Sequence, residues 1–183
     1  MATIASLEQL SAAARRAAQA SHWATVQACA TEILRRDARS AEGHFLAGLA
    51  EKAASRPLRA ADAFARALEL DSQRYDAAIE LADEYARSFR HGEARALLDQ
   101  YEARLGNSPR YLNLAGLTWS MLGMHERAWP LHHRANELQP GVPLFEANLA
   151  ACSVYLGKID EARALYLKLL ERNPGHQRNH YHL

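Results

Sequence analysis

Small apolar residues recur along this chain at a constant interval of 34 residues. Gly123 and Gly157 stand 34 apart, and so do Pro140 and Pro174. One series of small residues runs through Ala14, Gly48, Ala82, Gly116 and Ala150. A second series, twelve positions later, runs through Ala60, Ala94, Ala128 and Ala162, with Val26 as the exception in the first unit. Self-similarity at such a period is typical of repeat proteins, in which each repeat is one unit of supersecondary structure.

The interval divides the chain into five consecutive units, 7–40, 41–74, 75–108, 109–142 and 143–176. Positions 20, 24 and 27 of a unit are mostly apolar, and this spacing forms one face of a helix. Pro57, Pro109 and Pro143 stand where a helix begins, since a proline in the first turn loses no hydrogen bond. No stretch alternates apolar and polar residues as a strand would. The pattern therefore predicts an all-α chain with two antiparallel helices per unit, at about positions 1–14 and 17–31.

These spacings resemble the tetratricopeptide repeat (TPR), whose consensus has small residues at positions 8 and 20, an aromatic residue near 24, alanine at 27 and proline at 32. The resemblance covers residues 7–176. It implies a right-handed α-solenoid of five tandem helix-turn-helix repeats, forming a single domain over 1–183. Residues 177–183 are in phase with the start of a further helix, either a cap or the beginning of a sixth repeat.

The composition narrows the classes of partner. Hydrophobic residues make up 49% of the 183 residues, and 22 basic residues nearly balance 21 acidic ones. Because a basic excess is missing, we expect no nucleic-acid partner. No apolar run approaches the length of a membrane span, and the first residues do not form a secretory signal. Cys29 and Cys152 are too few for a disulfide framework, which favours a cytoplasmic location.

The sequence contains no motif that indicates catalysis. A glycine-rich phosphate loop, His-Glu-x-x-His, Cys-x-x-Cys and Gly-x-Ser-x-Gly are all missing, so we expect no enzyme activity, no catalytic residue and no cofactor in this chain. His176 and His180 are one helical turn apart, beside His182, and such a pair can hold a metal ion. Because no carboxylate or cysteine nearby completes the ligand set, no metal site is predicted.

In the repeat geometry, positions 2, 5, 6, 9, 12 and 13 of the first helices line a concave groove. The middle of this groove is expected to be acidic, through residues such as Asp76, Glu80 and Asp83, and its C-terminal third apolar, through residues such as Leu117 and Tyr155. This layout suits a ligand with an apolar anchor followed by basic residues. The candidate groove residues are Phe45, Leu49, Asp76, Ile79, Glu80, Asp83, Asn113, Leu117, Met121, Asn148, Ala151, Tyr155 and Arg178.

Two functions remain open from the sequence. The first is a protein–protein interaction scaffold that binds a partner peptide or helix in the groove, with self-association also possible. The second follows from Asn173–Leu183, which resembles the segment that joins the repeats to the catalytic domain in bacterial tetratricopeptide–sulfotransferase proteins. That resemblance implies a non-catalytic N-terminal domain whose groove docks the chain's own C-terminal continuation. The same eleven residues also fit the plain start of another repeat.

Overall fold

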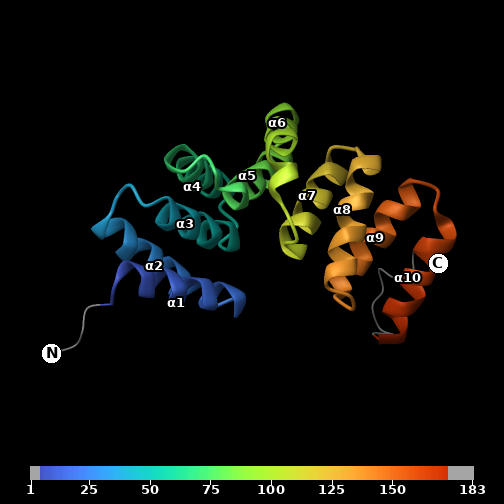
Figure 1. Ribbon diagram of the computed structural model, residues 1–183, viewed down its shortest axis with the longest axis horizontal. Helices are drawn as coiled ribbons and strands as arrows, with labels where there is room; N and C mark the ends of the chain where they lie inside the picture. The colour runs from blue at the N-terminus through green and yellow to red at the C-terminus, as the bar shows by residue number, and fades with distance from the viewer. Residues whose placement is uncertain (1–4, 173–183) are drawn as a thin grey trace. The chain divides into compact units, whose positions relative to one another are not determined.

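The computed structural model describes residues 5–172 and contains only helices in that range (Figure 1). The chain divides between Arg90 and His91 into two compact units. The helices of the first unit are α1 (Leu7–Gln19), α2 (Trp23–Arg36), α3 (Ala41–Ala53), α4 (Pro57–Leu70) and α5 (Tyr75–Arg87). Those of the second are α6 (His91–Tyr101), the short 3₁₀ helix η1 (Glu102–Arg104), α7 (Pro109–Met121), α8 (His125–Leu138), α9 (Pro143–Tyr155) and α10 (Ile159–Arg172).

The helices of residues 5–172 follow the 34-residue interval. The first helix of every predicted repeat begins at position 1 and ends at position 13, and every second helix begins at position 17. The prediction was wrong at the end of α6, which stops at Tyr101 and continues as η1. The division into two compact units falls inside the predicted repeat 75–108, so that α5 belongs to the first unit and α6 to the second. No helix in residues 5–172 is long and apolar enough to cross a membrane.

Position 15 of each repeat holds the backbone in the left-handed region. Gly123 and Gly157 have φ of 74° and 70°, and Ser21, Ser55 and Phe89 have φ of 59°, 58° and 59°. Only glycine adopts such angles without a steric cost, because other side chains bring Cβ close to the carbonyl oxygen. The glycines therefore mark the turn in the sequence, whereas the first three repeats make the same turn with a strained residue.

In the repeats 41–74 and 109–142, the two helices approach each other where position 8 faces position 24. A Cβ atom added to Gly48 would lie 2.5 Å from Cε1 of the Phe64 ring, and one added to Gly116 would lie 2.9 Å from the His132 ring. Both distances are shorter than any ordinary contact, so the ring occupies the space that a larger residue at position 8 would need. The small-residue series thus sets the spacing of helices within a repeat.

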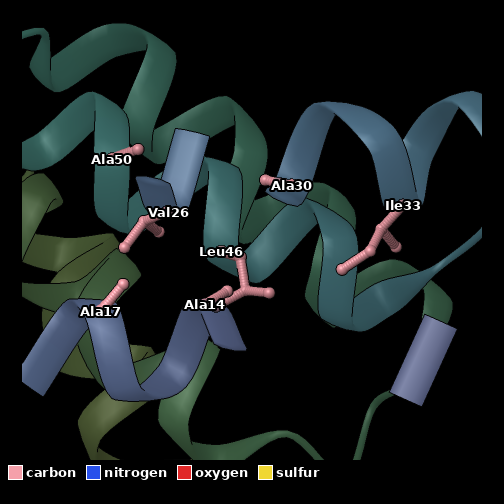
Figure 2. Packing of buried hydrophobic residues seen from close by; sticks show 7 residues of the cluster. All are labelled: Ala14, Ala17, Val26, Ala30, Ile33, Leu46 and Ala50. Atoms are coloured by element: carbon pink, nitrogen blue, oxygen red, sulfur yellow. The ribbon is translucent and has the colours of Figure 1, made fainter. Parts of the chain in front are cut away.

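Buried apolar residues fill the space between the first three helices. Figure 2 shows this cluster, with Ala14 and Ala17 from α1 facing side chains from α2 and α3. The remaining members are Val26, Ala30, Ile33, Leu46 and Ala50. Most of these side chains are small, so the helices pack closely. In the second unit, Ala150 of α9 packs in the same way against Ala162, Tyr166 and Leu169 of α10.

Candidate functional site: the faces of the first helices

In the first unit, the predicted acidic residues are held in ion pairs with basic residues of the same unit. Arg15 of α1 makes a two-pronged contact with Glu42 of α3, at 2.8 and 2.7 Å. Arg74 reaches the same carboxylate at 2.7 Å and pairs with Asp76 at 2.7 Å. The Arg74 guanidinium also lies over the Phe45 ring, 4.5 Å from its centroid. Glu42 and Asp76 therefore stabilise the contacts among these helices.

A second cluster surrounds Lys52 of α3. Its Nζ lies 2.7 Å from Glu80, 2.6 Å from Asp83 and 3.4 Å from Glu84, and Arg87 reaches Asp83 at 2.9 Å. Burial opposes the charge on Lys52, but Glu80 and Asp83 outweigh it and hold the pKa of Lys52 above its usual value. Burial raises the pKa of Glu84, against the attraction of Lys52. Three carboxylates here meet two cations.

The expectation of an acidic surface in the middle of the groove was therefore wrong. Glu80 and Asp83 are buried, with 1% and 0% of their surface exposed. Arg15, Arg74 and Arg87 join Lys52 around the carboxylates. Each carboxylate already has a cationic partner inside the protein, although Oδ1 of Asp83 has no hydrogen-bond partner among the described residues. A basic ligand would have to compete with these internal partners.

The apolar candidates of the first unit belong to the core. Phe45, Leu49 and Ile79 are all buried. Phe45 packs on Phe64 of α4 with ring centroids 5.8 Å apart. These side chains hold the helices of the unit together and present little surface to a partner.

In the second unit, a buried polar network fixes the face of α7 and α9. Oδ1 of Asn113 on α7 lies 3.0 Å from Nδ1 of His132 on α8 and accepts a hydrogen bond of 3.0 Å from Nδ2 of Asn148 on α9. Burial lowers the pKa of His132 from 6.5 to about 4, so its ring is neutral at pH 7. Asn148 therefore has a fixed orientation. Within the described part of the chain, no donor forms a hydrogen bond with the side-chain oxygen of Asn148, Oδ1.

Next to this network, α7, α8 and α9 line a small pocket that is partly open to solvent. Its lining residues are Leu117, Ser120, His125, His132, Asn148, Ala151, Cys152 and Tyr155. Tyr155 is 72% exposed, and its ring stacks on His125 with centroids 4.1 Å apart and planes 2° from parallel. The structure thus brings together Leu117, Asn148, Ala151 and Tyr155 of the predicted set, in a neutral and largely apolar pocket.

The remaining predicted residues lie apart from the pocket. Met121 is half-buried and does not line it, and Asn113 is buried beneath Asn148. Arg178 lies outside the described residues, as do His176, His180 and His182. In residues 5–172, no three His, Cys, Asp or Glu side chains come together as metal ligands.

The candidate set did not include His125 and Cys152, which the structure places in the pocket wall. The Cys152 thiol donates to the backbone carbonyl of His125 at 3.4 Å, and burial raises the pKa of that thiol. A buried thiol of raised pKa is a poor nucleophile, so Cys152 acts as a wall residue. His125 is the first residue of α8, at position 17 of its repeat. Only its stacking contact with Tyr155, at position 13 of the next repeat, identifies it as a residue of the pocket wall.

Neither a protein-family model nor a curated protein matches the chain. Solved structures do. YrrB, described as a TPR protein with an unusual peptide-binding site, is similar with a TM-score of 0.68 at 22% identity, over 84% of this chain and 79% of that one. A thermophilic TPR protein of Thermus thermophilus, TTC0263, has a TM-score of 0.69 at 16% identity, covering 96% of both chains. PilF of Pseudomonas aeruginosa has a TM-score of 0.71 at 17% identity, over 91% of this chain and 75% of that one. These similarities confirm an all-α fold of the TPR type.

Proposed function

We propose that this chain is a protein-interaction scaffold and that the face shared by α7 and α9 binds an extended peptide segment of a partner protein. The observation that carries the proposal is the neutral apolar pocket beside Tyr155. Large apolar side chains that stay exposed beside a pocket are typical of an interaction site. The neighbour YrrB is described as having a peptide-binding site, which is in keeping with this use of the fold.

The geometry supplies the two kinds of contact that an extended peptide needs. Tyr155 offers a large ring whose conformation is already restrained by stacking on His125, so little conformational entropy is lost on binding. The side-chain oxygen of Asn148, Oδ1, is an oriented acceptor for a main-chain N–H of the ligand. An apolar side chain of the ligand can then enter the pocket between Leu117 and Ala151.

The proposed ligand is simpler than the sequence suggested. Basic residues beside the anchor were expected because of the acidic groove, but Glu80 and Asp83 are buried against Lys52. We therefore propose an uncharged anchor and no requirement for flanking basic residues. We also propose that the chain is not itself an enzyme, since the pocket's one thiol, Cys152, is buried with its pKa raised. Cys29 and Cys152 are both free thiols, which is consistent with a reducing, cytoplasmic location.

The proposal is tested with peptides selected from a phage-displayed library of random heptapeptides on the full chain. Tyr155→Ala should weaken the binding of a selected peptide by about 1–3 kcal/mol, because the ring is a central apolar contact. Isothermal titration calorimetry measures this change in binding free energy. Leu167→Ala is the matched control: Leu167 is 48% exposed on α10, does not line the pocket and should leave the affinity unchanged. Failure to select any peptide, or binders that tolerate Tyr155→Ala, would contradict the proposal.

The alternative of a non-catalytic domain attached to a sulfotransferase rests on 173–183, which lie outside the described residues. No contact in the described chain favours it over the scaffold. It predicts that coding sequence follows Leu183 and contains a sulfotransferase domain, and the peptide of the selection experiment would then compete with that domain for Tyr155.

A further inference from the structure

We infer that the pocket of α7, α8 and α9 selects one small aliphatic side chain, of valine size, from the bound peptide. This inference rests on the proposed function and specifies the ligand at that site. The partner is a protein with an exposed extended segment in which a valine or alanine enters the pocket, with a main-chain N–H beside it directed at Asn148.

The size of the pocket sets the upper limit. Its volume is about 60 Å³. A dry protein cavity of about 150 Å³ holds a benzene molecule of six carbons, which is about 25 Å³ per carbon. By this scale the present pocket admits two or three carbon atoms. The side chain of valine needs about 75 Å³ for its three carbon atoms and so fills the pocket and slightly exceeds it, whereas leucine needs about 100 Å³ and phenylalanine about 175 Å³.

The chemistry of the walls determines the polarity of the occupant. Within residues 5–172, no Asp, Glu, Lys or Arg side chain lines the pocket, and His132 is neutral because burial lowers its pKa to about 4. Ser120 Oγ and His125 Nδ1 are buried atoms without a hydrogen-bond partner in the described chain, but both are shielded from solvent. A hydroxyl group entering the pocket would therefore lose its hydrogen bonds to water and meet mainly carbon atoms. Valine should be preferred over threonine, which has the same shape.

The walls resist widening, which sharpens the selection by size. The Tyr155 ring is stacked on His125. The backbone carbonyl of His125 on α8 accepts a hydrogen bond from the thiol of Cys152 on α9. Asn148 is held by Asn113. A larger ligand side chain would have to disturb these contacts, and the cost would appear as lost affinity.

The inference is tested on a heptapeptide selected with the full chain whose binding is weakened by Tyr155→Ala. Its anchor residue is replaced in turn by alanine, valine, leucine, phenylalanine and threonine, and each peptide is titrated by fluorescence anisotropy. Valine should bind best, and leucine or threonine should bind about 10-fold more weakly or worse, as expected for one misplaced methylene or hydroxyl in an apolar pocket. A preference for phenylalanine or threonine would overturn the inference while leaving the proposed function in place.

Variants of the pocket residues test the same preference for a side chain of valine size. Leu117→Ala enlarges the pocket and should move the preference from valine to leucine. Met121→Ala is the matched control, because Met121 is one turn further along α7, half-buried and outside the lining, so the preference should stay with valine. If Leu117→Ala fails to fold, Ala151→Val narrows the pocket from α9 and should move the preference to alanine. An unchanged preference in a folded variant would overturn the inference. So would binding of a second copy of the chain at this pocket, detected as a dimer that Tyr155→Ala dissociates.

Discussion

Replacing Gly48 by alanine tests whether the contact between positions 8 and 24 sets the helix spacing. The new Cβ would lie 2.5, 2.6 and 3.0 Å from three atoms of the Phe64 ring, whereas ordinary contacts begin near 3.4 Å. Phe64 is fully buried and packs on Phe45, so the ring has little room to retreat. The substitution gains about 1 kcal/mol of helix propensity, and overpacking of this kind costs about 1–3 kcal/mol. The net effect should be a loss of up to about 2 kcal/mol.

Gly92→Ala is the control, because an added Cβ on this α6 residue meets nothing within 4 Å. It should leave stability unchanged or raise it by up to about 1 kcal/mol. Urea denaturation followed by circular dichroism measures both variants, and the Gly48 variant should be the less stable by about 1–3 kcal/mol. Equal stability would refute the reasoning.

A double-mutant cycle separates the ring contact from any other cause. Phe64→Leu alone removes buried carbon atoms and destabilises the protein. In the Gly48→Ala background the shortened side chain makes room for the new methyl group, so the double variant should be more stable than the sum of the single effects predicts. Simple additivity would show that Gly48 and Phe64 do not compete for the same space.

Three further predictions concern backbone strain and protonation. Ser55→Gly should stabilise the protein by about 1 kcal/mol in urea denaturation, because φ at position 55 is 58°; no gain would mean that the serine side chain offsets the strain. Pro130→Ala, at an exposed position inside α8, should restore a helix hydrogen bond and raise stability by about 1–3 kcal/mol, seen as a higher melting temperature. The unfolded chain protonates His132 near pH 6.5 and the folded chain only near pH 4, so up to about 3 kcal/mol of stability should be lost as the pH falls through that window. His132→Phe should lack this part of the pH dependence, and an unchanged acid profile would show that another group causes it.

The sequence predicts the helices of this fold well because their positions depend on a repeated local pattern. Each repeat must bury one apolar face on its neighbour, so the 34-residue spacing carries the register with it. The turns are predicted less completely. Gly123 and Gly157 mark position 15, but Ser55 and Phe89 adopt the same φ without any sequence signal, because the packing of the two helices imposes the turn on whichever residue stands there.

The candidate site was harder to predict because periodicity gives the face of a helix and not its partners. The pattern does not say that Arg74, in the turn between α4 and α5, pairs with Glu42 of α3 as well as with Asp76 of α5. Pairing of this kind depends on where long side chains extend in three dimensions. On α9, by contrast, Ala151 and Tyr155 take part in no ion pair of residues 5–172, and Tyr155 is exposed.

Side chains at the same helix positions therefore have different roles in the two units. In the first unit, a basic ligand at Lys52 would have to displace a cation that already sits 2.6 Å from Asp83, so the gain from each new ion pair is offset by the loss of an old one. In the second unit, the proposed aliphatic side chain beside Tyr155 would bury an apolar wall, and it would have no ion pair of the described residues to displace. On the proposed function, net binding energy therefore comes from the apolar surface that the second unit leaves exposed, whereas the ion pairs of the first unit link its own helices.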